Sequence, residues 1–128
     1  IAAYIYNNPA RPFGETLVEG LQIEYVPRYG NWGGRGYSGG QAYVEDLNNP
    51  LLSAPVDTLD YVFMVHDKGY ANGVIYATDK QLVETLRALP INPMHWDNPP
   101  ANYFDAGYAF LYRWGAQKWF EGQIKNED

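Results

Sequence analysis

Cysteine is absent from all 128 residues of the chain. This absence excludes a disulfide framework, a zinc–thiolate site and a thiol nucleophile. The fold must therefore be held by packing alone. The absence leaves the compartment open, because a cysteine-free protein can belong to the cytosol or be secreted by a bacterium that does not rely on disulfides.

The chain also lacks a basic cluster and a long apolar run. Its nine Lys and Arg residues are scattered, and the formal net charge is −6. This balance argues against nucleic acid as a partner and against strong recruitment to anionic lipid. The longest apolar stretch, Tyr61 to Val65, is far too short to cross a bilayer. We expect no transmembrane segment and any membrane contact to be at the surface.

Aromatic residues are abundant instead, with four Trp, twelve Tyr and five Phe. A disordered chain would not carry so much apolar surface. The length fits one core, so we predict a single domain over residues 1–128. The N-terminal residues show no basic segment followed by an apolar stretch, and we expect any signal peptide to have been removed.

Hydrophobic spacing predicts a mainly α-helical fold. One helix is predicted from about Pro55 to Tyr70, a short one from Asp79 to Leu89 capped by Thr78 or Asp79, and a last one from after Pro100 to about Phe120. The segment 21–26 fits a strand or a helix, while 29–40 is a glycine-dense irregular loop and 41–54 a polar loop.

The predicted helices bury one stripe each. On the first helix the stripe consists of Val56, Leu59, Val62, Phe63, His66 and Tyr70. On the last it consists of Phe104 or Asp105, Tyr108, Ala109, Tyr112, Ala116, Trp119 and Phe120.

Two polar residues on these stripes are candidates for chemistry. A histidine on an apolar face, such as His66, is most often a packed core residue, but it can also serve as a base beside Asp67. Asp105 can cap its helix, or it can face the His66 helix and accept the imidazole N–H, which fixes the tautomer.

The glycine loop has three interpretations. It can be a flexible surface loop, although Trp32 and Tyr37 indicate order. The segment 34–39 matches G-x-G-x-x-G, but no strand leads into it and no clear helix follows, so nucleotide binding is disfavoured. Glycines also let backbone carbonyls turn inward to bind a hard cation such as calcium.

Together these segments resemble the phospholipase A2 family. The loop from Tyr29 to Gly36 is similar to the calcium loop of that family, and the segment Pro55-Val56-Asp57 to His66-Asp67-x-x-Tyr70 is similar to its active-site helix. The resemblance implies two long packed antiparallel helices, the predicted first and last, and a glycine-rich calcium-binding loop. It covers residues 29–40 and 55–70 well, and Asp105 more loosely.

The resemblance also assigns roles to residues. It implies that the carbonyls of Trp32, Gly34 and Gly36 and the carboxylate of Asp67 bind calcium. His66 would then be the general base, oriented by Asp105, with Tyr70 in the same network. The amide of Gly34 would help to hold the oxyanion. These roles imply calcium-dependent hydrolysis of the sn-2 ester of glycerophospholipids at a membrane or micelle surface.

The chain departs from the cysteine-rich members of the family. Positions that are rich in cysteine there hold Asn31, Gly33, Val62, Phe63, Lys68 and Gly69. Burial of Val62 and Phe63 can replace a bridge, whereas the other four residues cannot. Residues 41–54 resemble an insertion, and the family's β-wing has no clear counterpart. These departures indicate a distant, microbial branch.

Other functions remain open from the residues. One is a non-catalytic, phospholipase-like calcium- or membrane-binding module of a larger secreted protein. A zinc hydrolase is disfavoured, because His66 and His95 are the only histidines and lie far apart in sequence. A calcium site with one carboxylate should be weak and fill only outside the cell, so we expect a secreted protein.

Overall fold

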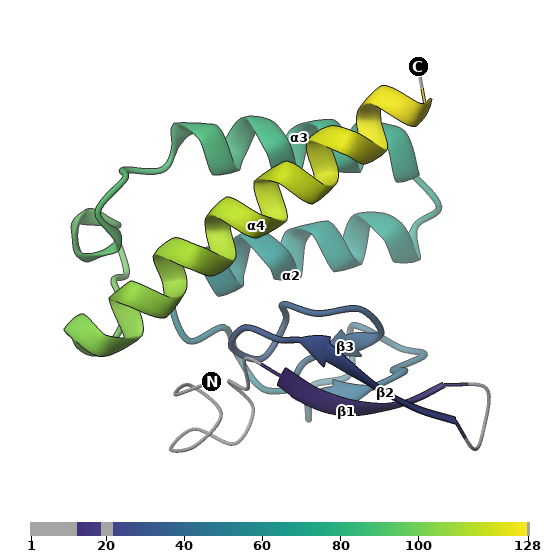
Figure 1. Ribbon diagram of the computed structural model, residues 1–128. Helices are drawn as coiled ribbons and strands as arrows, with labels where there is room; N and C mark the ends of the chain where they lie inside the picture. The colour runs from purple at the N-terminus through teal and green to yellow at the C-terminus, as the bar shows by residue number, and fades with distance from the viewer. Residues whose placement is uncertain (1–12, 19–21, 128) are drawn as a thin grey trace.

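The computed structural model describes residues 13–18 and 22–127, with side chains for residues 27–126. This part of the chain is mainly helical, as predicted, with long helices packed beside small β-hairpins (Figure 1). Its elements are β1 (Phe13–Val18), β2 (Gln22–Pro27), β3 (Tyr37–Ser38), β4 (Gln41–Ala42), α2 (Thr58–Ala71), α3 (Ile75–Ala88), the 3₁₀ turn η1 (Pro93–His95) and α4 (Tyr103–Glu127).

The N-terminal part of the described chain is an antiparallel β-hairpin. β1 pairs with β2 in a register that places Phe13 opposite Pro27 and Val18 opposite Gln22. The ambiguous segment at 21–26 is therefore a strand from Gln22 onward, and Leu21 lies outside the described residues. Its partner β1 was not predicted, because an isolated alternating run gives no signal for the strand it pairs with.

The two central helices form an antiparallel pair. Asp57 caps the N-terminus of α2 by accepting a hydrogen bond from the Asp60 amide (2.9 Å), so the helix begins three residues later than predicted from Pro55. A turn through Gly73, whose φ of 79° favours glycine, leads into α3. α3 begins at Ile75, before the predicted Asp79, and its N-cap residue Val74 makes no side-chain cap bond.

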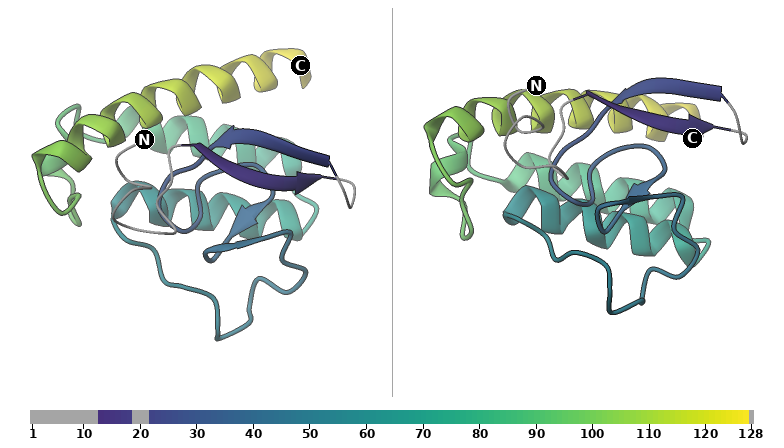
Figure 2. Two further views of the ribbon diagram at one scale, coloured as in Figure 1. Left: turned by 60° about the horizontal axis from the view of Figure 1, so that its bottom comes forward. Right: turned by 90° about the horizontal axis from the view of Figure 1, so that it is seen from below.

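The last helix crosses this pair obliquely. α4 runs from η1 toward the end where α2 turns into α3, roughly in the direction of α2 (Figures 1 and 2). The predicted antiparallel partners were the first and last helices; the antiparallel pair is α2 and α3. The buried Arg113 of α4 donates to the carbonyls of Leu86 and Leu89, and so binds the C-terminal end of α3.

The core lies between the three helices and the glycine-rich loop. Its buried residues are Tyr29, Trp32, Leu59, Val62, Phe63, Leu82, Leu86, Trp96 and Ala109. Phe63 meets Tyr112 of α4 edge to face at 5.5 Å between ring centroids, and Tyr29 stacks on Tyr108 at 5.7 Å. The buried stripe expected on the first helix therefore meets that expected on the last helix, through Phe63 and Tyr112.

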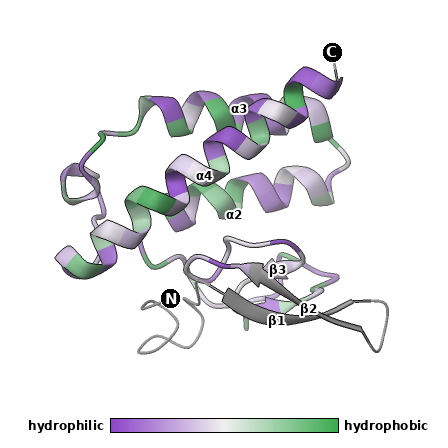
Figure 3. Cartoon of the chain, viewed as in Figure 1, coloured by the Kyte–Doolittle hydropathy of each residue, from purple (hydrophilic) through white to green (hydrophobic). Residues whose placement is uncertain are grey.

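Some predicted core positions are wrong. Val56 precedes α2 and is exposed, and Tyr70 is 38% exposed. On α4, Phe104 is 68% exposed and Trp119 is 64% exposed. Apolar residues therefore occur around most of the N-terminal half of α4 (Figure 3), so hydropathy alone could not select its buried face.

No helix in the described part of the chain is long and apolar enough to span a membrane.

Replacing Phe63 with Ala should lower the free energy of unfolding by about 3–5 kcal/mol, because it opens a cavity between α2, α4 and the loop. Urea unfolding of Phe63→Ala and of the matched control Leu51→Ala measures this cost. Leu51 is exposed, so the control should change stability by less than about 0.5 kcal/mol. Equal stability of the two variants would contradict the assigned core.

Candidate active site

His66 lies on the inward face of α2 and is only 7% exposed. Its Nε2 is 2.8 Å from Oδ1 of Asp79, a fully buried residue of α3. An ionised carboxylate only accepts hydrogen bonds, so Nε2 carries the hydrogen and donates it. This tautomer leaves the lone pair on Nδ1, the nitrogen that can then accept a proton.

Aromatic side chains hold the imidazole in place. Tyr70, one turn further along α2, donates its hydroxyl to the same Asp79 Oδ1 at 2.6 Å. The Tyr70 ring lies 4.3 Å from the imidazole centroid, and Phe120 of α4 meets the imidazole edge to face at 4.7 Å. The three helices therefore fix one ring orientation, as a positioned base requires.

Asp105 is not the carboxylate that binds His66. It lies in the first turn of α4, where its amide donates to Oδ1 of Asn102 (2.8 Å), and its own Oδ1 is buried without a hydrogen-bond partner in the described structure. Burial raises the pKa of the Asp105 carboxyl. The His66 partner predicted at Asp105 is instead supplied by Asp79.

The sequence predicts Asp79 as a helix cap and therefore does not identify it as the partner of His66. Since α3 begins at Ile75, Asp79 belongs to the second turn and shares a buried face with Leu82, Val83 and Leu86. Its spacing to these residues is i+3, i+4 and i+7, the pattern of one helix face. An acidic residue on an apolar stripe is therefore a usable signal at Asp79, as it is at Asp105.

A glycine allows α3 to come this close to α2. A Cβ built on Gly69 would lie 2.4 Å from Oγ1 and 3.0 Å from Cβ of Thr78, the residue before Asp79. Separations this short require the neighbouring backbone to move, since Thr78 Cβ is not a flexible atom. The absence of a side chain at Gly69 thus sets the distance at which Asp79 reaches His66.

The glycine-rich loop is tied to the same helix by Asp60. This fully buried carboxylate accepts hydrogen bonds from the amides of Asn31 (2.9 Å), Trp32 (2.8 Å) and Val56 (2.9 Å). Burial raises the pKa of Asp60 to about 7, against the opposing effect of these three donors. Gly30 has no room for a side chain, since its Cβ would lie 2.3 Å from Cγ of Asp60.

A second carboxylate, that of Asp57, connects the start of the loop to the start of α2. Asp57, besides capping α2, accepts the hydroxyl of Tyr29. Burial raises the pKa of the Asp57 carboxyl, and burial together with the charge of Asp57 raises the pKa of Tyr29. Hydrogen bonds to Asp57 and Asp60 therefore hold the start of the loop against the start of α2.

Asp67 follows His66 and faces the far end of this loop. Its Oδ2 accepts the hydroxyl of Ser38 at 2.7 Å, and its Oδ1 lies 4.0 Å from Nδ1 of His66, too far for a direct hydrogen bond. Burial raises the pKa of Asp67, against the opposing effect of His66 and Ser38. A cation beside this partly buried carboxylate would stabilise its charged form.

The loop has the backbone freedom that a carbonyl-lined cation site requires. Gly34 and Gly36 adopt φ values of 137° and 66°, which other residues rarely adopt. In the described part of the chain, no three His, Asp or Glu side chains cluster around a metal-sized space. A hard cation beside Asp67 would therefore draw most of its oxygens from loop carbonyls and water, as calcium can. Of the loop carbonyls predicted to bind calcium, that of Gly34 accepts the amide of Tyr37 (3.3 Å) and that of Gly36 accepts the amide of Tyr43 (2.7 Å), so each has one lone pair left for a cation.

The resulting arrangement combines two kinds of group at one end of α2. His66 offers an oriented nitrogen base, and the adjacent Asp67 offers a carboxylate at a glycine-rich loop. A base next to a cation site suits hydrolysis in which water is activated and a developing negative charge is stabilised. No family model, curated protein or solved structure matches the chain.

Replacing Gly69 with Ala should destabilise the protein by about 1–3 kcal/mol, because the new methyl group forces α3 away from α2. The same shift should lengthen the His66–Asp79 hydrogen bond and speed hydrogen exchange of the imidazole Nε2 proton, measured by NMR. Gly107→Ala is the control: its Cβ would meet nothing within 4 Å, so it should be neutral or stabilising. Slow exchange in both variants would show that Gly69 does not set this distance.

Proposed function

We propose that the protein is a calcium-dependent phospholipase of the A2 type, which hydrolyses the sn-2 ester of glycerophospholipids. The observation that supports this most directly is the buried His66–Asp79 pair beside Asp67 at the glycine-rich loop. The order of loop, Pro-Val-Asp helix and His-Asp-x-x-Tyr motif in the sequence points to the same family. Asp79 takes the orienting role that the sequence had suggested for Asp105.

The chain's own residues supply the proton transfers. His66 accepts a proton from a water molecule through Nδ1, and that water attacks the sn-2 carbonyl carbon. Asp79 and Tyr70 hold the imidazole so that Nδ1 stays the basic nitrogen and the imidazolium that forms is stabilised. His66 then returns the proton to the leaving lysophospholipid alkoxide, and the fatty acid is released without a covalent intermediate.

Calcium would be held by the Asp67 carboxylate and the carbonyls of Trp32, Gly34 and Gly36. When bound, it supplies a Lewis acid that polarises the ester carbonyl and a positive charge for the substrate phosphate. The amide of Gly34 would add a hydrogen bond to the oxyanion. Ser38 orients Asp67 toward the loop through its hydroxyl.

The proposed cation site also supports a location outside the cell. Asp67 is the single carboxylate assigned to it, and calcium sites with few charged ligands bind in the range of roughly 10⁻⁴ to 10⁻³ M. Such a site fills at extracellular calcium levels. We therefore propose a secreted protein that acts on phospholipid at a membrane or micelle surface.

Removing calcium should abolish the activity. We expect vesicles of phosphatidylcholine with different sn-1 and sn-2 chains to release only the sn-2 fatty acid in millimolar calcium, and none in excess chelator. Mass spectrometry of the released fatty acids measures which chain is released and whether its release requires calcium. Equal release in chelator, or release of the sn-1 chain, would overturn the proposal.

Mutation distinguishes Asp79 from Asp105 as the residue that orients His66. His66→Gln should lower kcat by at least about 10²-fold, because Gln cannot accept the proton at neutral pH. Asp79→Asn should also lower kcat by at least about tenfold, since the amide no longer fixes the tautomer. Asp105→Asn is the control and should leave kcat unchanged, because Asp105 makes no contact with His66.

Calcium titration of the same variants distinguishes catalysis from metal binding. Asp67→Asn should raise the calcium concentration needed for half-maximal activity, whereas Asp79→Asn should not. If His66→Gln kept full activity, His66 would not be the base. If the unmodified protein bound calcium through Asp67 but released no fatty acid, the chain would be a calcium-binding module and not this enzyme.

A further inference from the structure

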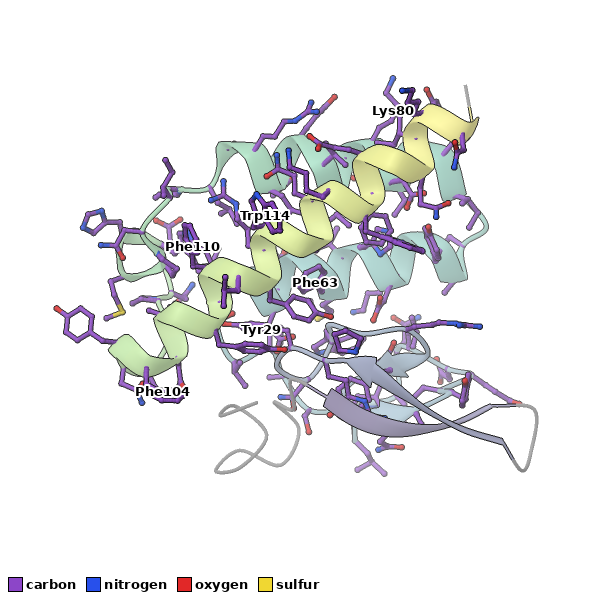
Figure 4. All side chains as sticks on the ribbon, viewed as in Figure 1. Tyr29, Phe63, Lys80, Phe104, Phe110 and Trp114 are labelled. Atoms are coloured by element: carbon purple, nitrogen blue, oxygen red, sulfur yellow. The ribbon has the colours of Figure 1, made fainter. Side chains whose placement is uncertain are left out.

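The outer side of α4 carries an uncharged aromatic surface. Its members are Tyr103, Phe104, Phe110, Leu111 and Trp114, here called the α4 aromatic face, and all five are exposed. At 100° per residue they lie within about 120° of the helix circumference. Figure 4 shows Phe104, Phe110 and Trp114 along the N-terminal half of α4.

This face contrasts with the opposite side of the same helix. Ala109 is buried there, and Tyr112 and Phe120 contact Phe63 and His66. The inner side therefore accounts for the packing of α4, and the outer aromatic residues are not needed for it. Exposing several large aromatic side chains in one stripe is unfavourable in water and is typical of a surface that meets a partner.

The charges around the face restrict the partner. From Tyr103 to Gln117 the helix holds two charged residues, and both lie outside the face: Arg113 is buried against carbonyls of α3, and Asp105 is half-buried. The first exposed charge along the helix, Lys118, comes beyond Trp114, and Glu121 after it is partly buried and paired with Arg87. An uncharged face on a protein of net charge −6 suits a partner without net negative charge.

The size and composition of the face favour lipid over a second copy of the chain. Five side chains offer on the order of 500 Å², below the roughly 800 Å² that each partner contributes to a stable interface. Trp and Tyr prefer the headgroup level of a bilayer, with Phe and Leu reaching the acyl boundary.

We propose that the α4 aromatic face docks the protein onto zwitterionic phospholipid bilayers, such as phosphatidylcholine. The proposal rests on the proposed function, since it names the surface that brings the enzyme to its substrate. Docking uses residues that do not belong to the calcium or base sites, so it should persist in chelator when hydrolysis is blocked.

Two tryptophans provide a matched test. Trp114 lies on the face and is 59% exposed, whereas Trp119 is 64% exposed and points about 140° away around the helix. The full chain is prepared as Trp114→Phe and Trp119→Phe, each of which keeps one exposed Trp. Both are mixed in chelator with brominated phosphatidylcholine vesicles, whose bromine quenches tryptophan fluorescence on contact.

We expect strong quenching in Trp119→Phe, which retains Trp114, and at least threefold weaker quenching in Trp114→Phe. Vesicle sedimentation should show that Phe110→Ser weakens partitioning at least about fivefold, whereas Trp119→Ser leaves it unchanged. The proposal would be overturned if the two Phe variants were quenched equally. It would also be overturned if the protein stayed in the supernatant or bound only to anionic vesicles. So would dimerisation in place of vesicle binding, seen by sedimentation velocity.

Hydrolysis of a short-chain phosphatidylcholine below its micelle concentration separates the two proposals. This monomeric substrate needs no bilayer. Hydrolysis of the monomer without vesicle binding would overturn docking and leave the enzyme intact, whereas vesicle binding without hydrolysis of any phospholipid would overturn the enzyme and leave docking intact.

Discussion

The buried carboxylate of Asp60 is the constraint on which the site depends. It belongs to the first turn of α2, and it accepts the amides of Asn31 and Trp32 in the glycine-rich loop. Because α2 also carries His66 and Asp67, this one helix positions both the loop and the candidate catalytic residues. Burying this charge is unfavourable, as its raised pKa indicates, and the backbone donors around it offset only part of that cost.

The second constraint is the distance between α2 and α3. Gly69 leaves no side chain between the helices, so Thr78 packs directly against its backbone and Asp79 reaches His66. Tyr70 adds a second donor to the same oxygen of Asp79. A single buried hydrogen bond thus depends on helix packing over several turns, as is common where a base must be held in one tautomer.

Close packing replaces cross-links in this cysteine-free chain, and it does so at Gly33 and Gly69, where the sequence did not predict that a bridge could be replaced. Gly33 lies against Phe63, whose ring would be 3.0 Å from a Cβ at that position, and Gly69 lies against Thr78 in the same manner. In each pair a residue without a side chain receives a larger neighbour. Aromatic contacts between Tyr29, Phe63 and the two tyrosines of α4 then close the core over the loop.

The sequence by itself determined the mainly helical class, the buried face of α2 through Leu59, Val62, Phe63 and His66, and the glycine-rich loop. Local spacing and glycine content are enough for these, because they depend on helix periodicity and backbone freedom. Only the tertiary structure decided that Asp79, and not Asp105, binds His66. It also decided which side of the aromatic α4 is buried. Both depend on how helices approach one another, which is set by contacts between residues distant in sequence, such as Gly69 with Thr78 and Arg113 with the end of α3.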